Sequence, residues 1–280
     1  MTEFIEILKA VFLGIVEGIT EWLPVSSTGH MILVDEFLRL KVSEEFLEMF
    51  LVVIQLGAIL AVPILFWNQL VPFSKKKSAE EKKNIYTLWL KVIVGVLPAA
   101  VLGILLDDFF DEHFYRFEVV AITLVVYGVA FIIVEKKKND ASYRVESVYD
   151  LSYTDALKIG AFQVLSLIPG TSRSGSTILG GMIGGVSRTA ASEFSFFMAI
   201  PVMLGASALK ILKFLMVGFA PTDLEVWLLV VGIVVSFLVS LLAIKFLMSF
   251  VKNHSFIIFG IYRIALGTLV IGYFLVKMLL

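Results

Sequence analysis

Six apolar runs, each long enough to cross a lipid bilayer as a helix, set the limits on how this chain can fold. They cover residues 46–66, 85–106, 118–135, 190–216, 225–248 and 255–279. Only 17% of the residues are charged, whereas a soluble domain has about 25%. The sequence therefore predicts an all-α polytopic membrane protein with about six transmembrane helices, forming one integral membrane domain over residues 1–280.

Lysine and arginine are concentrated in three of the connections between these runs. The connections contain Lys75, Lys76, Lys77, Lys82 and Lys83, then Lys136, Lys137, Lys138 and Arg144, and finally Lys252. By contrast, residues 107–113 and 218–225 contain acidic residues and neither Lys nor Arg. Because basic loops stay on the cytoplasmic side, we expect the lysine-rich connections there. The net charge of −1 gives no sign of a nucleic-acid partner, and we expect none.

Two further segments, at about 4–40 and about 153–188, are apolar but broken in the middle. The breaks read LPVSSTGH at 23–30 and IPGTSRSGST at 168–177. The six crossings alternate correctly only if each broken segment enters and leaves on the same side. Non-helical backbone at membrane depth is tolerated where protein or a water-filled cavity surrounds it. We therefore expect two re-entrant helix pairs, the first from outside and the second from inside.

The broken segments also resemble each other in sequence. G-x-x-E followed by L-P-x-S-S at 14–27 matches G-x-x-Q followed by I-P-x-T-S at 160–172, with small gaps. Together with the opposed directions, this match predicts an inverted-topology repeat. The first copy would cover 1–116, and the core of the second would cover 153–222. Inverted repeats bring broken helices together tip to tip near the membrane midplane.

The first polar cluster surrounds the first break and consists of Glu17, Glu21, Ser26, Ser27 and His30. A carboxylate at bilayer depth is unfavourable by several kcal/mol unless something compensates it. Glu17 and Glu21 share one helix face, so they need a cation, a proton or a basic partner. An internal salt bridge for the glutamates and simple helix capping for the serines are the structural alternatives.

The second polar cluster is PGTSRSGST at 169–177, and its hydroxyls come from Thr171, Ser172, Ser174, Ser176 and Thr177. Arg173 is the one strong cation expected near the tip of this loop. A glycine- and serine-rich loop that opens a helix offers backbone N–H groups to a phosphate, and arginine adds a bidentate fork. The alternative is that Arg173 only neutralises Glu17 or Glu21. Gln55, inside an apolar run, could line the same cavity or bond to a neighbouring helix.

Inverted repeats, broken helices and midplane charges are also typical of secondary transporters. The residues alone leave both a transporter and an enzyme open. Serine, histidine and arginine beside the acids favour the enzyme, because transport needs charge compensation but no nucleophile.

Both motifs together resemble the undecaprenyl-diphosphate phosphatase family, also called the bacitracin-resistance proteins. The E-x-x-x-E pair, the following S-S-T-G-H and the distant PGTSRSGST stand in the order of that family. The resemblance implies hydrolysis of the terminal phosphate of a C55 polyprenyl diphosphate, which recycles the lipid carrier for cell-wall synthesis and gives bacitracin resistance. It also implies a bacterial plasma membrane location, a site open to the outer face, and a divalent cation such as Mg²⁺ or Ca²⁺. Two further hypotheses are that the protein forms a homodimer and that it also acts as a flippase, moving the lipid product across the membrane.

The resemblance also implies roles for individual residues. Glu17 and Glu21 would hold the cation, with proton chemistry as an alternative for Glu21. Substrate binding would fall to Arg173 as the diphosphate clamp, helped by Ser26, Ser172, Ser174, Ser176 and Thr177. We favour Ser27 as the nucleophile and His30 as its base, and His30 as the nucleophile is the alternative.

Overall fold

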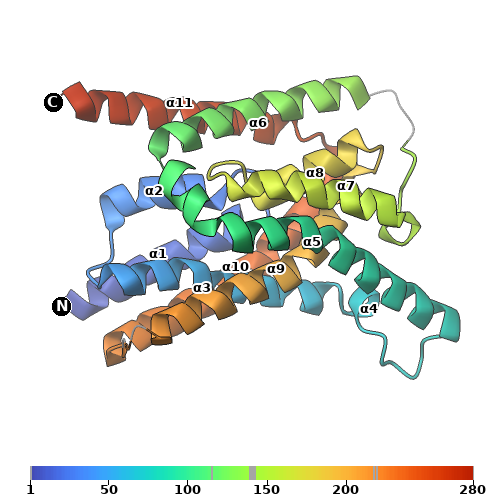
Figure 1. Ribbon diagram of the computed structural model, residues 1–280, viewed down its shortest axis with the longest axis horizontal. Helices are drawn as coiled ribbons and strands as arrows, with labels where there is room; N and C mark the ends of the chain where they lie inside the picture. Colours follow the sequence, from blue (N-terminus) through green and yellow to red (C-terminus); the bar gives the residue numbers. More distant parts are fainter. Residues whose placement is uncertain (1, 115, 139–142, 217, 219, 280) are drawn as a thin grey trace.

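The computed structural model describes residues 2–114, 116–138, 143–216, 218 and 220–279, and this part is built from α-helices (Figure 1). Two 3-10 turns, η1 (Val148–Asp150) and η2 (Leu165–Leu167), complete the described elements, which include no β-strand. The all-α prediction is confirmed. The side chains of four residues used in the charge argument lie outside the described part: Asp107, Asp108, Asp111 and Lys138.

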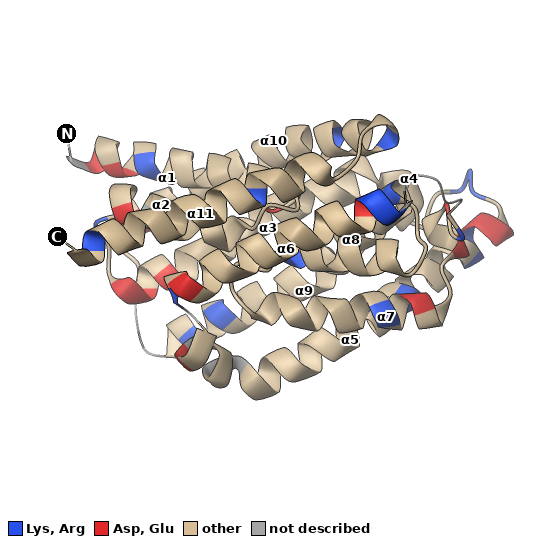
Figure 2. Cartoon of the chain, turned by 90° about the horizontal axis from the view of Figure 1, so that it is seen from above, with Lys and Arg blue, Asp and Glu red and all other residues tan. Residues whose placement is uncertain are grey.

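Six of the described helices are long and apolar enough to cross a membrane. They are α3 (Glu44–Leu65), α5 (Ala79–Phe114), α6 (Phe117–Lys138), α9 (Arg188–Met216), α10 (Asp223–Asn253) and α11 (Ile257–Leu279). Each contains one of the six apolar runs. Most Lys, Arg, Asp and Glu residues gather toward the two ends of these helices (Figure 2), and a short helix, α4 (Trp67–Leu70), follows α3. The chain is a multi-pass membrane protein.

Both broken segments form pairs of helices, and the second helix of each pair is short. The first pair is α1 (Thr2–Thr20) and α2 (Ser27–Leu38), and the second is α7 (Tyr153–Val164) and α8 (Arg173–Ile183). Helix α2 has 12 residues and α8 has 11, so each is about 17–18 Å long at 1.5 Å per residue. That length falls short of a hydrocarbon core of about 30 Å. Neither α2 nor α8 can therefore cross the bilayer by itself.

The two breaks have the same local geometry. Ser26 and Ser172 are the N-caps of α2 and α8, and they are the two non-glycine residues with positive φ among those described, at 74° and 73°. The Ser26 side chain accepts a hydrogen bond from Gly29 N at 3.2 Å, and the Ser172 side chain accepts one from Gly175 N at 3.1 Å. The sequence match pairs Ser26 with Thr171, whereas the cap that corresponds to Ser26 in the structure is the next residue, Ser172. The second turn therefore contains one extra residue before its cap.

Each broken pair packs on a long helix from the other half of the sequence. Helix α1 packs on α10, and α7 packs on α5, while α3 contacts α9 and α6 contacts α11 (Figure 1). Glycines permit the close approach. A Cβ atom added to Gly14 would lie 2.9 Å from the carbonyl oxygen of Gly232 on α10, and one added to Gly160 would lie 2.1 Å from that of Gly95 on α5. The packing of each pair on a helix of the opposite half holds the two breaks inside the bundle.

Candidate active site

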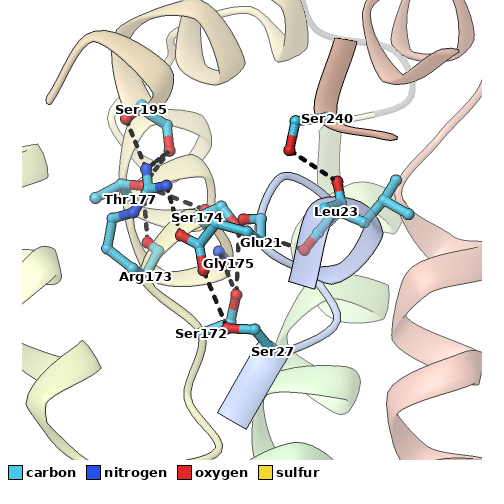
Figure 3. Close-up of polar contacts among 11 residues, drawn as sticks. Glu21, Leu23, Ser27, Ser172, Arg173, Ser174, Gly175, Thr177, Ser195 and Ser240 are labelled. Carbon is cyan, nitrogen blue, oxygen red and sulfur yellow. Dashed lines mark hydrogen bonds and ion pairs between the residues drawn. The ribbon is translucent and has the colours of Figure 1, made fainter. Parts of the chain in front are cut away.

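Arg173 and Glu21 bring the two breaks together. Glu21 directly follows α1, and Arg173 is the first residue of α8. Nη2 of Arg173 donates to Oε1 of Glu21 at 2.8 Å, and Nη1 donates to the carbonyl oxygen of Ser195 on α9 at 2.7 Å (Figure 3). The ion pair is buried, with side-chain exposures of 11% for Arg173 and 6% for Glu21. An acid from one half of the sequence and a guanidinium from the other thus neutralise each other in the interior of the protein.

Ser27, the first residue of α2, binds the second oxygen of the same carboxylate. Its Oγ donates to Oε2 of Glu21 at 3.0 Å. Ser174 joins the backbones, because its Oγ lies 3.1 Å from the carbonyl oxygen of Glu21 and 3.3 Å from that of Leu23 (Figure 3). The N-termini of α2 and α8 therefore converge on one point, and both direct partial positive charge toward it.

A cavity of about 190 Å³ opens at this point. Its polar wall contains Glu21, Ser27, Thr28, Gln55, Ser172 and Arg173. Its apolar wall comes from α9 and contains Val202, Met203 and Ala206. The cavity can therefore accept an anionic group next to a hydrocarbon chain. Gln55 lines this cavity, which is one of the two roles considered for it.

Of the six predicted substrate-binding residues, Ser172 and Arg173 line the cavity, whereas Ser26, Ser174, Ser176 and Thr177 are fully buried behind its wall. Ser176 is fully buried, and its Oγ lies 3.1 Å from the hydroxyl of Tyr127. Thr177 is also fully buried and donates to Oγ of Ser195 at 2.7 Å. Ser195 is in turn a partner of Arg173, so Thr177 supports the guanidinium from the side. In this arrangement both hydroxyls hold α8 in place.

Both ring nitrogens of His30 are bonded to groups other than Ser27. Its Nδ1 lies 2.7 Å from the carbonyl oxygen of Ser26, and its Nε2 lies 2.7 Å from the hydroxyl of Tyr262 on α11. A carbonyl can only accept, so Nδ1 carries the proton and Nε2 accepts from Tyr262 when the imidazole is neutral. Although both residues are described, no hydrogen bond joins His30 to Ser27. The group that binds the Ser27 hydroxyl is Glu21.

Glu17 has an unpartnered oxygen. Its side chain is 1% exposed, and its Oε1 has no hydrogen-bond partner. Glu21 and Arg173 are its charged neighbours. Magnesium and calcium prefer carboxylate and carbonyl oxygens, so Glu17 and Glu21 fit such an ion. Among the described residues, no three His, Asp or Glu side chains cluster as metal ligands, so further ligands would come from water, substrate or other oxygens.

Comparison with known proteins covers nearly the whole chain. A family model described as "Bacitracin resistance protein BacA" matches residues 10–269. The chain belongs to this family. An undecaprenyl-diphosphatase of Enterococcus faecalis is 56% identical over 272 residues, which are 97% of this chain and 99% of the relative. Those of Acetivibrio thermocellus and Lactiplantibacillus plantarum are 56% and 53% identical, over 97% and 96% of this chain and 98% of each relative. The family resemblance is confirmed, and no comparison favours the transporter alternative.

The structure adds a second cation that the sequence analysis missed. Arg263 on α11 is fully buried and contacts both breaks. The expectation of one strong cation near the tips is therefore wrong for this BacA-family chain. The sequence contained a signal for Arg263, because an arginine within the apolar run 255–279 requires partners inside the protein.

Proposed function

We propose that this chain hydrolyses undecaprenyl diphosphate to undecaprenyl phosphate and inorganic phosphate. The reaction recycles the lipid carrier for peptidoglycan synthesis and thereby gives resistance to bacitracin. One observation carries the proposal: Ser27, Glu21 and Arg173 line a single cavity and are joined by hydrogen bonds. A hydroxyl, a proton acceptor and a guanidinium are the groups that phosphoryl transfer needs beside a metal ion.

The diphosphate binds where α2 and α8 begin. Backbone N–H groups of the two helix N-termini point at the phosphate oxygens, and Arg173 provides two parallel donors. The apolar wall formed by Val202, Met203 and Ala206 lies against the isoprenoid chain. Binding replaces Glu21 by phosphate at the Arg173 guanidinium. The Oε2 atom of Glu21, 3.0 Å from the Ser27 hydroxyl, stays placed to accept its proton.

Ser27 attacks the terminal phosphorus. A bond forms between its Oγ and phosphorus, and the bond from phosphorus to the bridging oxygen breaks, so that undecaprenyl phosphate leaves. The hydroxyl proton passes to Glu21, whose Oε2 lies 3.0 Å from the Ser27 oxygen. Water then attacks the phosphorus, the bond from phosphorus to Oγ of Ser27 breaks, and Glu21 returns its proton to the serine oxygen as inorganic phosphate leaves. Arg173 stabilises the charge that develops on the transferred group.

His30 takes a secondary role in this proposal. The imidazole is bound by Ser26 and Tyr262, so it would have to leave both before acting on Ser27. His30 as the base, or as the nucleophile through a phosphohistidine, remains the alternative. The two routes differ in which residue carries the phosphoryl group.

A divalent cation completes the proposed site. Glu17 and Glu21 would hold it, and the unpartnered Oε1 of Glu17 supports this assignment. Bound there, a Mg²⁺ or Ca²⁺ ion would neutralise phosphate charge. The protein groups would still align the substrate and move the proton.

Loop charges support an outward-facing site. The lysine-rich connections mark the cytoplasmic end of the bundle, and the α1–α2 pair, which contributes Ser27 and Glu21, enters from the opposite end. The site would then be open to the outer face of the plasma membrane. A homodimer follows from the family resemblance alone, and light scattering of the detergent-purified protein tests it.

Purified protein in detergent tests the function directly. Inorganic phosphate released from a long-chain polyprenyl diphosphate is measured with and without a chelator. We expect release from the wild type, inhibition by the chelator, and recovery with added Mg²⁺. Ser27→Ala should be inactive, whereas Ser74→Ala, in a lysine-rich connection far along the chain from both breaks, should be as active as wild type. Equal rates for these two variants would contradict the proposal.

A further inference from the structure

Arg263 connects the two breaks through their backbones. The residue lies within α11 and is 0% exposed. Its Nη2 donates to the carbonyl oxygens of Gly170 at 2.8 Å and Thr171 at 2.9 Å, and its Nη1 lies 3.2 Å from that of Pro24. Pro24 belongs to the first break, and the other two belong to the second. One side chain thus bonds to both turns at once.

No carboxylate pairs with Arg263 in the part of the chain that the structure describes. Among the described residues, none forms an ion pair with it, and the ring of Tyr127 lies 5.5 Å from the guanidinium carbon. Carbonyls in a broken helix lack the partners that a continuous helix supplies, so buried ones need a donor from elsewhere in the protein. A planar guanidinium with five N–H groups can serve several carbonyls at fixed angles, which a lysine cannot.

The bonded carbonyls lie directly before the two helix caps. Pro24 is two residues before Ser26, and Thr171 is one residue before Ser172. The residues just after those caps are Ser27 and Arg173. Any shift of one turn relative to the other would therefore move the Ser27 hydroxyl relative to the Arg173 guanidinium.

We propose that Arg263 is the positioning residue that fixes Ser27 and Arg173 relative to each other for phosphoryl transfer. The inference rests on the proposed function. Arg263 is absent from the cavity lining and acts from behind the turns, so it does not touch the substrate. Its charge also lies near both helix N-termini, but its carbonyl bonds carry the argument.

A positioning role predicts a specific kinetic pattern. Misplacing a reacting group by about 1 Å lowers the rate by about 10²-fold. The loss should fall on kcat, because the groups that bind the diphosphate remain present and KM stays close to the wild-type value. Loss of Arg173, which contacts the substrate, should instead change both constants.

Arg263→Lys and Arg263→Ala test the proposal in the phosphate-release assay. Arg188→Lys is the matched control, because Arg188 is also largely buried but pairs with Glu135, away from the breaks. For Arg263→Lys we expect a fall in kcat of about 10²-fold with KM nearly unchanged. Arg188→Lys should keep its kcat, with a lower unfolding temperature. Added guanidinium ions should restore part of the kcat of Arg263→Ala, since they can fill the vacated site and bond to the same carbonyls.

The possible outcomes separate this inference from the proposed function. If wild type and Arg188→Lys release no phosphate, the proposed function fails. If they do and Arg263→Lys matches them in kcat, only the positioning role fails. A rise in KM as large as the fall in kcat would make Arg263 a substrate contact. If neither Arg263 variant folds, with or without guanidinium, its role is purely stabilising and the proposal is overturned.

Discussion

The guanidinium of Arg173 lies 2.8 Å from the carboxylate of Glu21, although 152 residues separate them in the sequence. Both groups are buried, and removing one member of a buried pair leaves the other charge uncompensated. Each residue therefore stabilises the fold when the site is empty and, in our proposal, takes part in the reaction when the diphosphate is bound. Variants of the pair have to be assessed for folding and for turnover separately.

Arg173→Ala should lower kcat/KM for phosphate release by 10³-fold or more, on the scale of losing a charge clamp in phosphoryl transfer. Arg173→Lys should recover only part of this loss, because a lysine keeps the charge but lacks the planar fork. Both are measured in detergent, with the folded fraction determined by size-exclusion chromatography.

Lys210→Ala is the control for Arg173→Ala. Lys210 pairs with Glu48 at 2.7 Å, and the Glu48 side chain is 66% exposed, so this pair contributes at most about 1 kcal/mol. Its activity should equal that of wild type. Full activity in Arg173→Ala would remove Arg173 from the site.

Glu17→Gln and Glu21→Gln should respond differently to added metal. Glu17 has an oxygen without a partner, so Glu17→Gln should need more Mg²⁺ but approach wild-type kcat at saturation. Glu21 also accepts the Ser27 proton in our proposal, so Glu21→Gln should stay slow at any Mg²⁺ concentration. Titration of phosphate release with Mg²⁺ distinguishes them. Complete recovery of Glu21→Gln would limit Glu21 to metal binding.

Tyr262→Phe tests whether His30 acts as the base. The substitution removes the hydroxyl that binds Nε2 of His30 and keeps the ring that stacks on the imidazole. If Glu21 accepts the proton, kcat should remain near wild type. Tyr273→Phe is the control, because Tyr273 lies on α11 like Tyr262 but its hydroxyl is bonded to Glu36. A large change in kcat for Tyr262→Phe alone would favour His30.

A trapped intermediate tests the nucleophile itself. Rapid quenching of wild type with labelled substrate should give a phosphoryl group on Ser27, stable in acid. A label on His30, which would be lost in acid, would require the phosphohistidine route.

The sequence predicts the parts of this protein more fully than their contacts. Apolar length and lysine placement give the crossings, because the bilayer imposes both directly. The two motifs contain Glu21, Ser27 and Arg173, but their order along the chain does not reveal hydrogen bonding. Pairing of His30 with Tyr262 depends on how α2 lies against α11, which no local pattern encodes. Arg263 was missed because its partners are backbone carbonyls, which any residue supplies.

Gly160→Ala should destabilise the protein through helix packing. A Cβ at this position would lie 2.1 Å from the carbonyl oxygen of Gly95, so α7 and α5 must separate. Overpacking of this kind lowers the free energy of unfolding by about 1–3 kcal/mol, and backbone contact places the site at the upper end. Thermal unfolding in detergent measures the effect.

Gly205→Ala is the matched control, because nothing lies within 4 Å of the added Cβ and alanine favours the helix. Its unfolding temperature should equal or slightly exceed that of wild type. Since α7 leads into the turn that precedes Arg173, Gly160→Ala should also lower turnover at temperatures where it remains folded. Equal stability of the two glycine variants would show that α7 does not depend on close contact with α5.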